Sequence, residues 1–179
     1  MAMLLDAKDD INVASKTGRT PLFVAVDADH VDTVKLLLER GAKVDKALAT
    51  GETPLIAAAR NGNAQILSIL LENGADPNKV VASGSPLIYA AQSASAECVK
   101  RLLDENAQVN EARPDGLTPL MAAAQIYRAA DCVKLLLDAG ADVNAKSKGG
   151  RTVLDFALQS GSPQTVSLIL SRIKKAEAR

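Results

Sequence analysis

Gly51-Glu-Thr-Pro-Leu55 recurs in close copies along the chain of 179 residues. The copies are Gly18-Arg-Thr-Pro-Leu22, Gly84-Ser-Pro-Leu87, Gly116-Leu-Thr-Pro-Leu120 and Gly150-Arg-Thr-Val-Leu154. The position held by proline falls at 21, 54, 86, 119 and 153, so that successive copies are 33, 32, 33 and 34 residues apart. A sequence that repeats with this period predicts a stack of similar structural units.

A second motif alternates with the first and has the same period. It reads Gly74-Ala-Asp-Pro-Asn78, and its other copies are Gly41-Ala-Lys-Val-Asp45, Asn106-Ala-Gln-Val-Asn110 and Gly140-Ala-Asp-Val-Asn144. Glycine is the residue that most readily ends a helix in the left-handed conformation, and asparagine comes next. The first residue of each copy therefore predicts the end of a helix.

Each repeat predicts two helices. Thr before Pro is an N-cap followed by proline at the first helical position. An Ala-rich helix such as 54–60 follows, then a break such as Asn61-Gly62, and then a bulkier helix such as Val34-Lys-Leu-Leu-Leu38. A helix pair cannot bury both of its faces alone, whereas stacked copies can, so we predict an all-α solenoid with projecting turns. Small first helices beside bulky second helices should curve it, with the first helices and the turns on the concave side.

These repeats resemble the ankyrin repeat, which has a period of about 33 residues and a Thr-Pro-Leu-His motif. The resemblance covers residues 4–173 and implies a single domain, residues 1–179, with repeats at approximately 15–47, 48–79, 80–112, 113–146 and 147–179. Residues 1–14 match the tail of a preceding repeat, since residues 4–12 align without a gap with residues 136–144. The chain begins either with a half-repeat cap or inside a longer array, and we favour the second interpretation.

The departures from the ankyrin pattern are specific. The histidine after Thr-Pro-Leu is absent from all five copies, and apolar packing must replace its hydrogen bonds in the first four. Repeat three is one residue short before Ser85, and repeat four has one extra residue near Tyr127. Repeat five lacks the second motif and ends in a basic segment, which is typical of a capping repeat. The residues at the histidine position are Phe23, Ile56, Ile88, Met121 and Asp155.

Composition argues against several classes of protein. The 21 basic residues are balanced by 21 acidic residues, and there are only two Phe, two Tyr and no Trp, so the chain lacks the features of nucleic-acid binding. No apolar run approaches the roughly 18 residues of a membrane span. Two cysteines without a Cys-x-x-Cys motif indicate neither a disulfide framework nor a zinc site. We expect a soluble chain in the cytoplasm, with the nucleus as the second location.

The residues that could do chemistry are better explained structurally. His30 is the only histidine and lies at a predicted turn between helices. Cys98 and Cys132 occupy one repeat position, where stacked helices about 8–10 Å apart exceed the reach of a disulfide, so we predict buried free thiols. Lys146, Lys148 and Arg151 form a solvated basic turn. No phosphate-binding or nucleophile motif is present, so we predict no enzymatic activity and no catalytic, cofactor or metal residue.

The ankyrin resemblance implies a module that binds a protein partner, of unknown identity, on its concave face. The alternative is a structural or targeting array within a larger protein whose activity lies outside these residues. An enzyme is the third class, and no motif supports it. We expect a monomer, with weak self-association through the truncated N-terminal edge as the alternative.

The binding positions implied by the resemblance are the turn tips and the ends of the first helices. Interface hot spots favour Tyr, Trp and Arg, so we expect Arg19, Arg60 and Tyr127 to be the anchors. The turn tips are Lys16, Thr17, Arg19, Ala49, Thr50, Glu52, Pro114, Asp115, Leu117, Lys148 and Arg151. The first-helix ends are Asp27, Arg60, Asn61, Gln92, Ser93, Gln125 and Ile126, with Tyr127 beside them.

Overall fold

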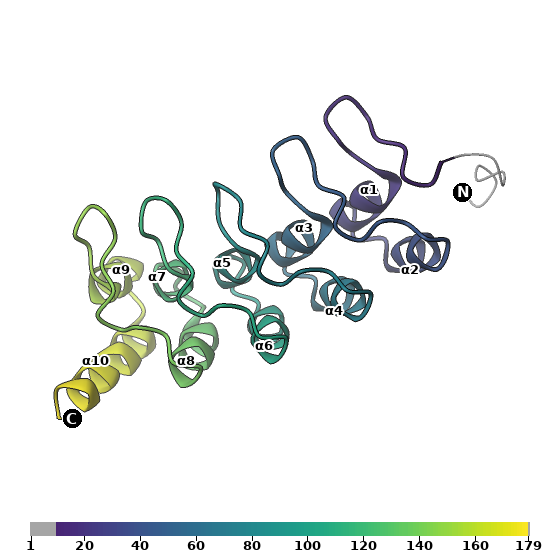
Figure 1. The fold of residues 1–179 in the computed structure, drawn as a ribbon. Helices are drawn as coiled ribbons and strands as arrows, with labels where there is room; N and C mark the ends of the chain where they lie inside the picture. The colour runs from purple at the N-terminus through teal and green to yellow at the C-terminus, as the bar shows by residue number, and fades with distance from the viewer. Residues whose placement is uncertain (1–9, 179) are drawn as a thin grey trace.

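The computed structural model describes residues 10–178, and over this range it is a row of five helix pairs (Figure 1). Each pair lies within one predicted repeat. The part of the predicted leading half-repeat that falls on residues 1–9 lies outside the described residues. The first helices are α1 (Pro21–Asp27), α3 (Pro54–Asn61), α5 (Pro86–Gln92), α7 (Pro119–Ala124) and α9 (Val153–Ser160). The second helices are α2 (Val31–Glu39), α4 (Ala64–Glu72), α6 (Ala96–Asp104), α8 (Ala130–Asp138) and α10 (Pro163–Glu177).

The first helices begin where the repeated motif predicts. In each repeat the residue before the first helix has extended backbone, and its hydroxyl accepts a hydrogen bond of 3.1 to 3.4 Å from the N–H three residues later. This bond satisfies one of the N–H groups that a helix start leaves without a partner. The five capping residues are Thr20, Thr53, Ser85, Thr118 and Thr152.

The position of the missing histidine is filled in two ways. Phe23, Ile56, Ile88 and Met121 are all at most 2% exposed, so apolar packing does replace polar bonding in the first four repeats. In the fifth repeat, Asp155 forms a capping box with Thr152, whose backbone N–H donates to the Asp155 carboxylate at 2.8 Å. These hydrogen bonds lower the pKa of Asp155.

The second helices of the first four repeats end as the second motif predicts. Gly41, Gly74, Asn106 and Gly140 have φ values of 86°, 83°, 62° and 89°. Asn106 is the only one with a side chain, and asparagine tolerates this left-handed conformation better than most residues. The two motifs therefore define both limits of the helical part of these repeats.

The core is continuous between repeats as well as within them. Ala57, Ala58 and Ala59 on α3, and Ala122, Ala123 and Ala124 on α7, have no exposed surface because the neighbouring first helices cover them. Small side chains allow this close approach, and adjacent first helices contact each other more extensively than adjacent second helices do. The row therefore bends toward the first helices, and the connecting turns project on that concave side (Figure 1).

A row of side-chain hydrogen bonds joins successive repeats after the second helices. The last residue of each of the first three second motifs accepts from a backbone N–H in the next repeat, and Asn12 begins the series. Asn78 and Asn110 also donate through Nδ2 to the carbonyls of Asn106 at 3.2 Å and Gly140 at 3.4 Å. The accepting pairs are Asn12 with Lys43 (2.7 Å), Asp45 with Asp76 (3.3 Å), Asn78 with Gln108 (2.8 Å) and Asn110 with Asp142 (2.9 Å).

The projecting turns, here called fingers, are closed by a backbone hydrogen bond between their two ends. Fingers 1, 2, 4 and 5 contain five residues each, 15–19, 48–52, 113–117 and 147–151. Finger 3 contains only four, residues 81–84, so the missing residue of repeat three is the last one of its finger. The N–H of Ala49 donates to the Thr17 carbonyl at 3.0 Å, and the N–H of Lys148 donates to the Asp115 carbonyl at 2.9 Å. Finger 3 makes no such bond with finger 2 or finger 4.

Replacing Leu136 by alanine tests the contribution of the core between repeats. Leu136 is fully buried, so Leu136→Ala should lower the free energy of unfolding by about 2–5 kcal/mol, as measured by urea denaturation. Leu36 on α2 is 37% exposed and serves as the control, because Leu36→Ala should cost clearly less. Equal losses in the two variants would contradict the packing described here.

Asp45 is the one carboxylate among the four accepting side chains, and Asp45→Asn should stabilise the protein. Partial burial raises the pKa of Asp45 and the charge of Asp76 adds to the rise, although the hydrogen bond from the Asp76 N–H opposes them. The side-chain amide introduced at position 45 would also supply an Nδ2–H donor, the group through which Asn78 and Asn110 bond a carbonyl of the next repeat. Asp45 is largely exposed and the charge of Lys79 favours its carboxylate, so we expect the free energy of unfolding to rise by at most about 0.5 kcal/mol at pH 7.

The gain from Asp45→Asn should depend on pH with a definite sign. A carboxyl group whose pKa is raised by folding destabilises the fold once it ionises. The advantage of the amide should therefore shrink as the pH falls below about 3.9, where Asp45 is protonated in both the folded and unfolded states. Asn78→Asp is the reciprocal control and should destabilise at pH 7. If Asp45→Asn stabilised the protein more at pH 3 than at pH 7, the predicted direction of the pH dependence would be wrong.

Candidate binding surface

The fingers and the C-terminal ends of the first helices together form the inner surface of the array (Figure 1). Most of the turn-tip positions predicted to bind a partner have exposed side chains, and Glu52 is half-buried. Their side chains are not part of the core between repeats. The exposed ones are Lys16, Thr17, Arg19, Ala49, Thr50, Pro114, Asp115, Lys148 and Arg151.

Leu117 is a correction to the predicted surface. It is only 8% exposed and belongs to the hydrophobic core, so its side chain is not available to a partner. The reason is its apolar side chain, which joins the hydrophobic core, whereas the polar residues at the same position of the other five-residue fingers remain at least partly accessible. The tip of finger 4 is formed instead by Pro114 and Asp115.

The predicted positions at the first-helix ends differ in exposure. Arg60 is exposed, and Tyr127 lies in the turn between α7 and α8 with 62% of its surface accessible. The remaining positions are half-buried, because neighbouring repeats cover part of each side chain. They are Asp27, Asn61, Gln92, Ser93, Gln125 and Ile126.

Four of the predicted binding residues form one network of ion pairs in repeats one and two. Asp27 is paired with Arg19 of its own repeat and with Arg60 of the next, where Nη2 lies 2.9 Å from Oδ1. Arg60 Nε also lies 3.3 Å from an oxygen of Glu52. Burial opposes the charge of Arg60, but these two carboxylates outweigh it and raise its pKa. Two of the three expected anchors, Arg19 and Arg60, are thus already paired within the protein.

Repeat five has a pair at the same positions. The Arg151 guanidinium donates to the amide oxygen of Gln159 and lies over the Phe156 ring, 4.0 Å from its centroid. In repeats one, two and five, the last finger residue therefore bonds the residue eight positions later. The sequence carries this signal as complementary groups at i and i+8, which cannot be recognised from single positions taken one at a time.

Asn61 and Ser93 contribute bonds between repeats rather than a free surface. Asn61 Nδ2 donates to the Asp27 carbonyl at 3.3 Å, and the Ser93 hydroxyl donates to the Ala59 carbonyl at 3.0 Å. Both residues therefore tie the end of one first helix to the end of the one before it. Gln92 and Gln125, in contrast, make no side-chain hydrogen bond within residues 10–178.

The two cysteines are buried and unbridged, as predicted. Burial raises the pKa of both thiols, to about 11 for Cys132, where the charge of Asp131 adds to the effect. His30 precedes α2 in the turn between helices and is exposed. At Cys98 a hydrogen bond with the Ser95 side chain acts to lower the thiol pKa, but burial outweighs it.

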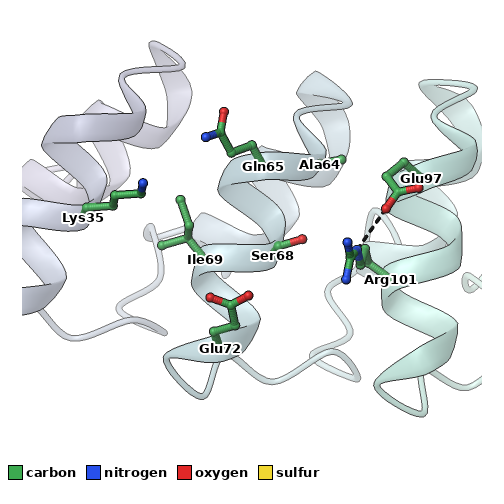
Figure 2. Close-up of a pocket in the computed structure, with 8 residues that line it drawn as sticks. All are labelled: Lys35, Ala64, Gln65, Ser68, Ile69, Glu72, Glu97 and Arg101. Atoms are coloured by element: carbon green, nitrogen blue, oxygen red, sulfur yellow. Dashed lines mark hydrogen bonds and ion pairs between the residues drawn. The ribbon is translucent and has the colours of Figure 1, made fainter.

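The outer surface carries a shallow hollow across α2, α4 and α6 (Figure 2). Its volume is about 390 Å³, and Ile69 lies in it among polar side chains such as Gln65 and Glu72. Glu97 and Arg101 form an ion pair of 2.9 Å at one side. The hollow is therefore lined mainly by polar groups, and its one large apolar side chain, Ile69, is only 9% exposed.

Among residues 10–178 there is no group of three or more His, Cys, Asp or Glu side chains that could hold a metal ion. A bilayer-spanning helix is not found in residues 10–178 either.

The family is shown by a sequence model. The model described as "Ankyrin repeats (3 copies)" matches residues 1–81 and again residues 82–178. The chain therefore belongs to the ankyrin-repeat family, whose members generally act as protein–protein interaction modules. No curated protein matches the sequence closely enough to be reported as a relative.

The raised thiol pKa values predict slow alkylation of the native protein. The thiolate is the reactive form, so Cys98 and Cys132 should react with iodoacetamide at pH 8 far more slowly than a free cysteine. Addition of 6 M guanidinium chloride should restore the rate of an ordinary thiol, and mass spectrometry counts the labels. Rapid double labelling without denaturant would contradict the burial, and an intramolecular disulfide would contradict the stacking register.

Proposed function

We propose that this protein binds a protein partner on its inner, concave surface, through the fingers and the first helices. One observation carries the proposal. Exposed side chains of several types gather on the fingers, although the fold requires only a closing hydrogen bond and a glycine there. A surface that packing leaves free, on a rigid scaffold, is suited to recognition. Binding of protein partners, without enzymatic activity, is also the usual role of the family.

We further propose that the protein acts in a reducing compartment, the cytoplasm or the nucleus. Cys98 and Cys132 are both free, and free buried thiols are typical of proteins that never meet an oxidising environment. The balanced charge favours neither nucleic acid nor a membrane surface as the partner.

The experiment begins by isolating the partner from the source cell with the protein as bait, followed by mass spectrometry. Affinity is then measured for three single variants, Arg19→Ala, Arg60→Ala and Tyr127→Ala. We expect the Tyr127 variant to bind at least about tenfold more weakly, because exposed tyrosines are frequent hot spots of protein interfaces. The two arginine variants should lose less, because part of each guanidinium is already satisfied by Asp27 and Glu52.

The control variants lie on the outer surface. Lys35, Lys100 and Lys134 are exposed on α2, α6 and α8, and their replacement by alanine should leave affinity unchanged. If the outer-surface variants abolish binding while all three inner-surface variants bind like the wild type, the assignment to the inner surface is wrong.

A further inference from the structure

The inner surface is not uniform along the array. In repeats one, two and five the last residue of the finger bonds the side chain eight positions later, near the end of the first helix. These pairs are Arg19 with Asp27, Glu52 with Arg60, and Arg151 with Gln159. Polar groups at these positions are therefore satisfied within the protein before any partner arrives.

Repeats three and four lack this pair. Finger 3 is one residue short, and the missing residue is the one that would lie eight positions before Gln92. In repeat four the corresponding residue is Leu117, which is buried and apolar and cannot bond Gln125. Two glutamines at equivalent positions of adjacent helices, α5 and α7, consequently make no side-chain hydrogen bond within residues 10–178.

Other features of the middle repeats increase their accessibility. Finger 3 makes no backbone hydrogen bond with finger 2 or finger 4, whereas fingers 1 and 2, and fingers 4 and 5, are bonded together. The side chains of Ala82 and Ser83 at its tip are exposed and uncharged. Tyr89 lies one turn before Gln92 on α5 and is only half-buried, so an aromatic ring lies beside an unpaired amide.

The chemistry of this surface selects the kind of partner. An amide side chain both donates and accepts, which complements the N–H and C=O of a peptide backbone. The first-helix positions of α5 and α7 carry no charge, and on finger 4 Arg113 and Asp115 are paired with each other at 2.9 Å. A charged segment would therefore lose hydration there without gaining an unpaired opposite charge. An uncharged peptide with free backbone groups fits this surface best.

Repeat spacing selects the conformation of that peptide. Neighbouring helices pack about 8–10 Å apart, so Gln92 and Gln125 present their amides at about that interval. A polyproline II helix advances about 9 Å per turn of three residues and has no internal hydrogen bonds, so every third residue presents the same free groups. In a β-strand, residues i and i+3 point to opposite faces. Aromatic side chains such as Tyr89 are also the usual contact for proline rings.

We propose that the inner surface of repeats three and four binds an uncharged, proline-containing peptide segment in the polyproline II conformation. The amides of Gln92 and Gln125 bond its backbone at every third residue, and Tyr89 contacts its proline rings. This proposal rests on the proposed function and specifies which part of the inner surface is used and by what class of partner.

The test uses a phage-displayed library of random 12-residue peptides selected on the whole protein. Enriched peptides should be uncharged in their central segment and contain proline, and the free synthetic peptide should show the circular dichroism of polyproline II. Its affinity, from fluorescence anisotropy, should fall about threefold to tenfold for Gln92→Ala and for Gln125→Ala, the range that one hydrogen bond supplies. Gln159→Ala is the matched control and should leave affinity unchanged, because Arg151 already occupies that amide.

An insertion supplies a second variant. Arginine inserted between Gly84 and Ser85 restores a five-residue finger and places a guanidinium eight positions before the glutamine of α5, as in repeat five. Circular dichroism and urea denaturation should show an intact fold, whereas peptide affinity should fall as it does for Gln92→Ala. An inserted variant that folds and binds like the wild type would overturn the role assigned to the free amide.

The remaining outcomes separate this inference from the proposed function. If no peptide is enriched, or if enriched peptides are charged and indifferent to Gln92→Ala and Gln125→Ala, the inference is wrong. If binding of such peptides depends on Asp27 and Arg60 instead, the inner surface is still the binding surface and only the inference fails. If binding depends on Lys100 and Lys134 of the outer surface, both fail.

Discussion

A helix pair in this protein can be covered only by another helix pair, and this constraint shapes the whole molecule. Ala57, Ala58 and Ala59 occupy three consecutive positions of α3, facing in three directions, and none has any exposed surface. In the last repeat, Leu158 occupies the position that corresponds to Ala59, and it is 59% exposed. Burial therefore depends on neighbours, and stability in such an array is approximately the sum of the intrinsic stability of each repeat and the interactions between adjacent repeats. The alternation of small first helices with bulky second helices follows from the same requirement.

Local chemistry made most of the fold predictable. A hydroxyl residue before proline begins every first helix but one, and Gly41, Gly74, Asn106 and Gly140 end the second helices. These signals act through hydrogen bonds and backbone angles within a few residues, so they can be recognised without knowledge of the tertiary structure. The row of accepting side chains at Asn12, Asp45, Asn78 and Asn110 was not predicted, because its bonds join residues about 30 positions apart.

The candidate surface was less predictable than the fold. Repeat phase identified positions on one side of the array, but it could not distinguish Leu117, which is buried, from its counterparts Arg19, Glu52 and Arg151. Nor could it show that Arg19 and Arg60 share the Asp27 carboxylate. Position in a repeat fixes the direction of the backbone, whereas the availability of a side chain depends on which neighbouring groups have already bonded it. The sequence determines these pairings only through three-dimensional contacts.

The interrupted row of fingers has a consequence for how the two halves of the array are joined. Finger 3 shares no backbone hydrogen bond with finger 2 or finger 4, and the Val81 side chain lies near Gly51, while fingers 1 and 2, and fingers 4 and 5, share backbone hydrogen bonds. On the opposite side of this joint, the hydroxyls of Ser93 and Ser95 bond the carbonyls of Ala59 and Gly62. The backbone hydrogen bonds of the fingers therefore form two separate pairs. At the third repeat the two halves of the array are joined through the helices, where α5 packs against both α3 and α7.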